Sequence, residues 1–247
     1  DRVDPVLMSR AVAGHAASIG IAGSFSFVFA GTLGQWYGWR AASVAGGLMT
    51  VVAWILVFMR VPAQLRLAHQ APSGALFDFR PIFRNRSAMG YALGYWAHTW
   101  EMNALRGWAV AFLTYVAATT GEKVWLAPTT VAMLMGLVGT WVSVAGNEAS
   151  IRLGRQRLVG LAMTGSAICG AGIGFLGPRS YPLAAALVLV YGLLIWLDSS
   201  SLTAGSAGSA EPGRRGATLA VHSTLGYAGG FFGPLALGAT LDLVGGA

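Results

Sequence analysis

Charged residues are scarce in this chain of 247 residues: Asp, Glu, Lys and Arg make up only 10% of it, while 55% of the residues are hydrophobic. A soluble domain carries about a quarter charged residues on its surface. The sequence therefore lacks the polar surface of a water-soluble fold, and we expect a membrane protein.

Cysteine and lysine are nearly absent too, since Cys169 is the sole cysteine and 15 of the 16 basic residues are arginine. One cysteine excludes an intrachain disulfide framework and a cysteine-based metal site, and we expect neither metal nor cofactor. The net charge of +7 does not indicate a nucleic-acid partner, because the arginines form short clusters between long apolar runs. No phosphate-binding loop of the kind that ATP-driven pumps use is present.

Seven apolar runs are each long enough to cross the hydrocarbon core as a helix, which takes about 20 residues. They cover residues 8–32, 41–59, 88–118, 124–145, 158–176, 183–205 and 216–240. None alternates in polarity as the strands of a membrane barrel do, so the backbone must be satisfied within helices. The predicted fold class is all-α, a multi-pass transmembrane helical bundle with seven visible spans.

The basic residues are distributed unevenly over the connections between these spans. Twelve of the 16 lie in alternate connections, three lie in the others, and Arg106 lies inside a span. Because cytoplasmic loops carry the excess of Lys and Arg, we expect the N-terminal end in the cytoplasm. The longest connection, residues 61–87, includes the aromatic and basic segment 77–84, which is typical of a stretch in the headgroup layer.

Three glycine-containing segments carry a family resemblance. The basic turn Arg152-Leu153-Gly154-Arg155-Gln156-Arg157, the Gly-x-x-Gly segment between Gly31 and Arg40, and the glycine-rich run 226–238 resemble the major facilitator superfamily. The turn departs from the family pattern at Asn147 and Ile151. The resemblance implies helices five to eleven of a twelve-helix transporter, so we expect four further helices before this chain and one after it.

On that mapping, residues 1–60 are the end of an N-terminal six-helix bundle, 61–87 a central cytoplasmic loop, and 88–247 most of a C-terminal bundle. The first and last spans align at an offset that places His15 on His222. We expect gating or packing roles for both histidines and for Gly230, Gly233 and Pro234. Arg152, Gly154, Arg155 and Arg157 form the cytoplasmic signature turn, in which Gly allows the tight turn.

Ionisable side chains inside the membrane indicate a functional or structural role, because inserting a charged one at the bilayer centre costs about 2.5–3.5 kcal/mol. The third span carries His98, Glu101, Asn103 and Arg106 near its centre, and the sixth carries Asp198. Glu101 is the predicted proton-coupling residue, which His98 tunes. Asp198 is predicted either to pair with Arg106 or to titrate as a second site.

The planar guanidinium group of Arg106 is suited to bind an anionic or carbonyl-bearing substrate. Asn103, Trp100 and Trp108 are predicted to bind the substrate with it. A structural role in locking the bundle is the competing interpretation for these residues. We expect a secondary transporter of a small organic solute, coupled to protons, and not an enzyme. It would lie in the bacterial inner membrane and work as a monomer at full length. The alternatives are an intramembrane enzyme, such as a lipid acyltransferase built on His98 and Asp198, and a transporter-fold sensor.

Overall fold

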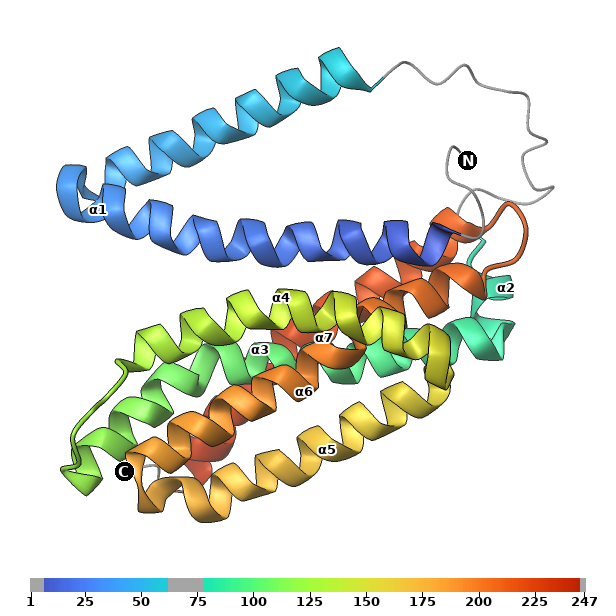
Figure 1. Ribbon diagram of the computed structural model, residues 1–247. Coiled ribbons are helices and arrows are strands. Elements are labelled where there is room, and N and C mark those ends of the chain that lie inside the picture. Colours follow the sequence, from blue (N-terminus) through green and yellow to red (C-terminus); the bar gives the residue numbers. More distant parts are fainter. Residues whose placement is uncertain (1–6, 62–77, 245–247) are drawn as a thin grey trace. The chain divides into compact units, whose positions relative to one another are not determined.

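The computed structural model describes residues 7–61 and 78–244 and separates the chain into two compact units. One unit comprises residues 1–20 and 77–247, and the other comprises residues 21–76. Helix α1 (Met8–Arg60) contains both of the first two predicted spans and breaks at Gly38, where φ is 81° and ψ is 167°. Figure 1 shows the chain reversing direction at this break. Only glycine adopts such a conformation without strain, so Gly38 fixes the turn.

Most of the predicted central loop, residues 62–77, lies outside the described residues. The part that follows forms a short helix, α2 (Arg80–Arg84), with Pro81 in its first turn. Asn85 then caps the next helix, because its side-chain oxygen accepts a hydrogen bond from the backbone amide of Ala88 at 3.0 Å.

The rest of the larger unit is a bundle of five long helices, and the prediction of an all-α fold is confirmed (Figure 1). The helices are α3 (Arg86–Thr120), α4 (Pro128–Leu153), α5 (Arg155–Leu176), α6 (Tyr181–Gly208) and α7 (Arg215–Leu243). A short 3₁₀ turn, Gly177–Arg179, joins α5 to α6.

Helix α4 differs from the span 124–145 that its apolar run predicts. It begins at Pro128, since proline suits the first turn of a helix, and it continues to Leu153. The polar residues Asn147 and Ser150 do not end it because both are buried. The length of an apolar run therefore underestimates the length of a membrane helix when the polar end of that helix is buried in the protein.

Helix α6 lies at the centre of the bundle, against α3, α4 and α5, while α3 lies along α7. Buried apolar side chains fill the end of the bundle formed by the last turns of α3 and the first turns of α4 and α6. This cluster contains Ala109, Leu113, Val116, Val131, Met135, Tyr181, Ala184, Ala185 and Val188. Glycine brings the helices close: a Cβ on Gly146 would collide with the backbone carbonyl of Leu197 in α6.

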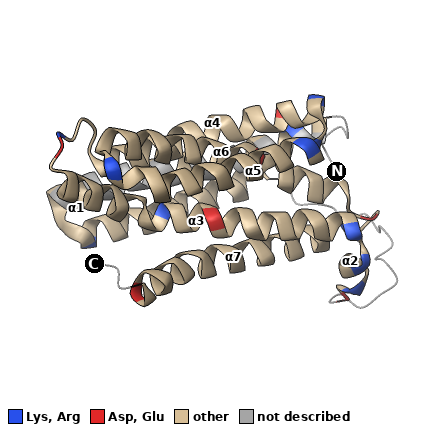
Figure 2. Ribbon diagram, turned by 90° about the horizontal axis from the view of Figure 1, so that it is seen from below, with Lys and Arg blue, Asp and Glu red and all other residues tan. Residues whose placement is uncertain are grey.

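Four segments of the described residues are long and apolar enough to cross a membrane: 36–60, 128–153, 155–179 and 181–208. Helices α3 and α7 are equally long but less apolar, and they pack along each other. Most charged positions lie near helix ends (Figure 2). Four polar residues of α3 and α7 are buried within the protein: His98, Thr99, Thr218 and His222.

Candidate functional site

An ionisable pair lies buried between α3 and α6. His98 Nδ1 is 2.9 Å from Asp198 Oδ1, and their side chains are only 1% and 3% exposed. The contact has ion-pair distance, and the other ring nitrogen, His98 Nε2, has no hydrogen-bond partner among the described residues. A buried carboxylate needs a positive partner, so a proton on His98 would stabilise this contact.

Serine side chains hold the segment of α6 that carries Asp198. Ser200 and Ser143 of α4 share a hydrogen bond through their hydroxyls. Ser201 donates to the backbone oxygen of Gly146, also in α4, at 3.4 Å. Ser200 and Ser201 are therefore interhelical contacts, and they fix the segment of α6 that carries Asp198 against α4.

A second imidazole stacks close to the pair. The ring of Tyr95 lies between two histidines, with its centroid 5.6 Å from that of His98 and 4.1 Å from that of His222. His222 Nε2 shares a hydrogen bond with Thr203 Oγ1 at 3.3 Å, whereas His222 Nδ1 has no partner within the described part of the chain. His222 is thus buried beside the ionisable pair and joins α7 to α6.

Glu101 occupies a separate, half-buried position on the neighbouring face of α3. Its carboxylate accepts a hydrogen bond from Ser166 Oγ of α5 at 3.2 Å and interacts with the hydroxyl of Tyr191 on α6. His98 therefore meets Asp198 of another helix and not Glu101, which the helical spacing had suggested. The three predicted coupling residues form two adjacent acidic sites.

Arg106 does not pair with Asp198, so that part of the prediction is wrong. Its side chain is exposed, and no acidic group of the described residues lies within ion-pair distance of it. Asp198 has His98 as its partner because the two face each other across the α3–α6 contact. Arg106 thus has no acidic partner among the described residues, whereas His98, Glu101 and Asn103 of the same helix each contact another group.

Several residues predicted to bind substrate or to gate lie in the contact between α3 and α7, which we call the α3–α7 seam. A Cβ on Gly233 would collide with the backbone oxygen of Trp100, and one on Gly230 would lie 2.7 Å from Asn103 Nδ2. Asn103 donates to the backbone oxygen of Thr99 at 2.9 Å. Gly229 and Gly233 of α7 therefore lie directly against the backbone of α3.

Two hydrogen bonds cross this seam. Trp108 Nε1 donates to the backbone oxygen of Pro234 at 3.1 Å, and Thr99 Oγ1 donates to that of Gly226 at 2.6 Å. Trp108 thus ties α3 to the proline-containing part of α7. Trp100 remains half-buried, with its ring tilted against that of Trp96 at 5.3 Å.

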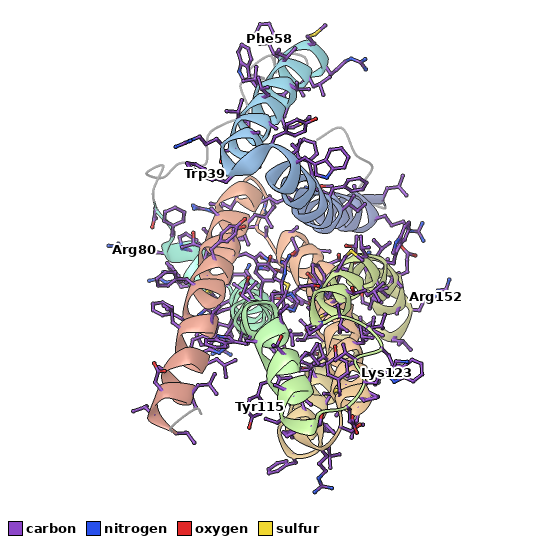
Figure 3. The ribbon with its side chains drawn as sticks, turned by 90° about the vertical axis from the view of Figure 1, so that its left-hand side faces the viewer. Trp39, Phe58, Arg80, Tyr115, Lys123 and Arg152 are labelled. Carbon is purple, nitrogen blue, oxygen red and sulfur yellow. The ribbon has the colours of Figure 1, made fainter. Side chains whose placement is uncertain are left out.

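The predicted signature turn consists of one residue between α4 and α5. Gly154 has φ 88° and ψ 126°, a conformation that suits glycine alone. Arg155 reaches back into the bundle and donates to the backbone oxygen of Ser201 at 2.7 Å. Arg152 and Arg157 are exposed, and Figure 3 shows Arg152 pointing away from the bundle.

Near this turn, Glu148 forms a bidentate ion pair with Arg10. Arg10 Nε donates to Glu148 Oε1 at 2.8 Å, and Arg10 Nη2 donates to Glu148 Oε2 at 2.9 Å. His15, one turn further along α1, is exposed. His15 and His222, which the internal repeat aligns, therefore have different surroundings.

Sequence reasoning missed the partners that build the site, among them Tyr95, Thr203 and Ser166. Tyr95 lies three residues before His98, the spacing of neighbours on one helix face, and this signal was available in the sequence. Thr203 and Ser166 belong to other helices, and no spacing within one helix shows which helices touch.

These features define a helical bundle that crosses a membrane several times and keeps ionisable groups inside it. A sequence model described as the Major Facilitator Superfamily matches residues 2–234, and the chain belongs to this superfamily. Its members are transporters, and they move small molecules across membranes. No curated protein and no solved structure matches the chain significantly.

Proposed function

We propose that the protein is a secondary active transporter that moves a small organic solute by alternating access and couples this movement to protons. The buried contact between His98 and Asp198 carries the proposal. With one proton on the pair, an imidazolium faces a carboxylate and the net charge is zero. Without that proton, a carboxylate remains in a medium of low dielectric constant, which is strongly unfavourable.

This charge balance supplies a rule for coupling. While α3 and α6 stay together, the pair retains its proton because the bare carboxylate has no water around it. When a conformational change admits water to one side, the ionised carboxylate becomes tolerable and the proton can leave. Glu101, on the adjacent face with Ser166, is the second proton-accepting group in the proposal.

Arg106 is the proposed contact for the solute. An unpaired arginine within a membrane helix is favourable only where it meets water or an anion, and Arg106 is exposed. Its planar fork suits a carboxylate or a carbonyl group. Trp100 and Asn103 lie close to it in the sequence, while Trp108 holds α3 against α7 through its bond to the backbone oxygen of Pro234.

The enzyme alternative receives partial geometric support, because His98 and Asp198 do meet. Acyl transfer also needs a nucleophile within hydrogen-bond reach of the imidazole, and His98 Nε2 has no such partner among the described residues. Transport is therefore the better proposal, in a bacterial inner membrane and as a monomer without nucleic acid.

The test uses the full-length protein in proteoliposomes under an imposed pH gradient. A panel of organic anions and lipophilic solutes is offered, and accumulation is measured by mass spectrometry. We expect Asp198→Asn to abolish gradient-driven accumulation but to retain exchange of labelled for unlabelled solute, since exchange needs no net proton movement. Asp242→Asn, at an exposed position near the end of α7, is the matched control. Undiminished accumulation by the Asp198 variant would refute the coupling role.

A further inference from the structure

The aromatic and basic segment before α3 builds a groove that the transport proposal does not use. The groove encloses about 230 Å³ between α2 and α7, and its lining is almost entirely apolar. The lining residues are Phe79, Phe83, Ala220, Val221, Thr224 and Leu225. Pockets for drug-sized ligands typically hold about 300–1,000 Å³ and place polar groups within the cavity. This groove is smaller and has the character of a slot for a hydrocarbon chain.

Helix α2 carries two arginines next to the groove phenylalanines, and neither of them lines the groove itself. Phe79 and Phe83 are four residues apart and lie on one side of the turn, and Arg80 and Arg84 follow each of them by one position. Both arginines are exposed and have no ion-pair partner among the described residues. Figure 2 shows this basic end beside the first turns of α7, and Figure 3 shows Arg80 directed outward from α2.

The nearby acidic residues do not neutralise these arginines. Asp78 accepts a hydrogen bond from the backbone amide of Arg80 at 3.1 Å, and Glu211 lies 3.6 Å from Arg214. Exposed Arg86, at the start of α3, adds a further positive charge at the same end. This end of the unit is therefore positive, next to an apolar slot.

The groove is held in place by its neighbours. Asn85, directly after α2, donates to the backbone oxygen of Ser209 at 2.8 Å and so ties α2 to the connection between α6 and α7. Ile82, between the two groove phenylalanines, is buried. A platform fixed in this way can present the arginines and the slot together.

We infer that this groove binds an anionic glycerophospholipid, with one acyl chain in the slot and its phosphate against Arg80 and Arg84. Arginine clusters at the cytoplasmic ends of membrane helices attract anionic headgroups, and the apolar slot adds hydrophobic burial that a free anion does not provide. The inference is independent of the solute and of the coupling ion.

The test uses full-length protein in phosphatidylcholine nanodiscs that contain one of two photoactivatable lipids. These are phosphatidylglycerol and phosphatidylcholine with the same diazirine-bearing acyl chain, and labelled peptides are mapped by mass spectrometry. We expect the phosphatidylglycerol probe to label residues 79–83 and 220–225 preferentially. Arg80→Gln and Arg84→Gln should each reduce this labelling about fivefold and leave labelling by phosphatidylcholine unchanged.

Thr224→Trp, at an exposed position in the groove, should block the slot and reduce labelling there by both probes. Arg157→Gln and Leu161→Trp change an exposed arginine and an exposed leucine away from the groove and serve as matched controls. Equal labelling by the two probes, or an Arg80 variant that behaves like the Arg157 variant, would show unspecific annular lipid and overturn the inference. Absence of label from both segments in the unaltered protein would overturn it as well.

Discussion

The contact between His98 and Asp198 predicts a large energetic coupling between these two positions. Replacing His98 by leucine leaves Asp198 buried without a positive partner, and breaking a buried pair in this way costs about 3–5 kcal/mol of stability. Replacing Asp198 by leucine leaves a neutral imidazole unsatisfied and should cost about 1–3 kcal/mol. The double variant removes both polar groups, so we expect it to be destabilised by only about 1–2 kcal/mol.

The coupling energy of this double-mutant cycle should therefore be about 4–5 kcal/mol, well above the roughly 0.6 kcal/mol average of interhelical hydrogen bonds in membrane proteins. Unfolding is followed by circular dichroism in mixed dodecylmaltoside–SDS micelles. A coupling energy of about 0.5 kcal/mol or less, equivalent to simple additivity, would refute the ion-pair assignment.

Three smaller changes test the packing around the site in the same unfolding assay. Gly229→Ala should destabilise the protein by about 1–3 kcal/mol because its Cβ would meet the backbone of α3, whereas Gly174→Ala, with open space around it, should be neutral or slightly stabilising. Gly154→Ala should cost about 1–3 kcal/mol through its backbone conformation alone, since nothing lies within 4 Å of the added methyl group. Trp108→Phe keeps an aromatic ring but loses the hydrogen bond to Pro234, so we expect the free energy of unfolding to fall by about 0.6–1 kcal/mol. No measurable fall would contradict a stabilising role of this hydrogen bond in the α3–α7 seam.

Apolar length and charge placement were sufficient to predict an all-α membrane bundle, because spanning helices leave a strong signal in composition. That signal weakens where a helix is covered by protein. Helix α4 therefore extends past its apolar run through buried Asn147 and Ser150. The glycine-containing turn at Gly154 was also predicted, since its requirement is local.

The pairing of ionisable groups could not be predicted in the same way. Positions along one helix show that His98 and Glu101 are 60° apart, but they do not show which helix faces each of them. In the structure His98 faces Asp198 of α6 and Glu101 faces Ser166 of α5. The packing of α3 and of α5 against α6 decides these partners, and that packing depends on small residues spread over the whole bundle.

Proton movement driven by solute is the most direct test of the central claim. Proteoliposomes that contain the full-length protein and an internal pH-sensitive dye receive a solute identified in the uptake screen, with no pH gradient imposed. The account predicts a change in internal pH on addition of solute that Asp198→Asn abolishes and Asp242→Asn preserves. Solute entry in the unaltered protein without any change in internal pH would contradict it.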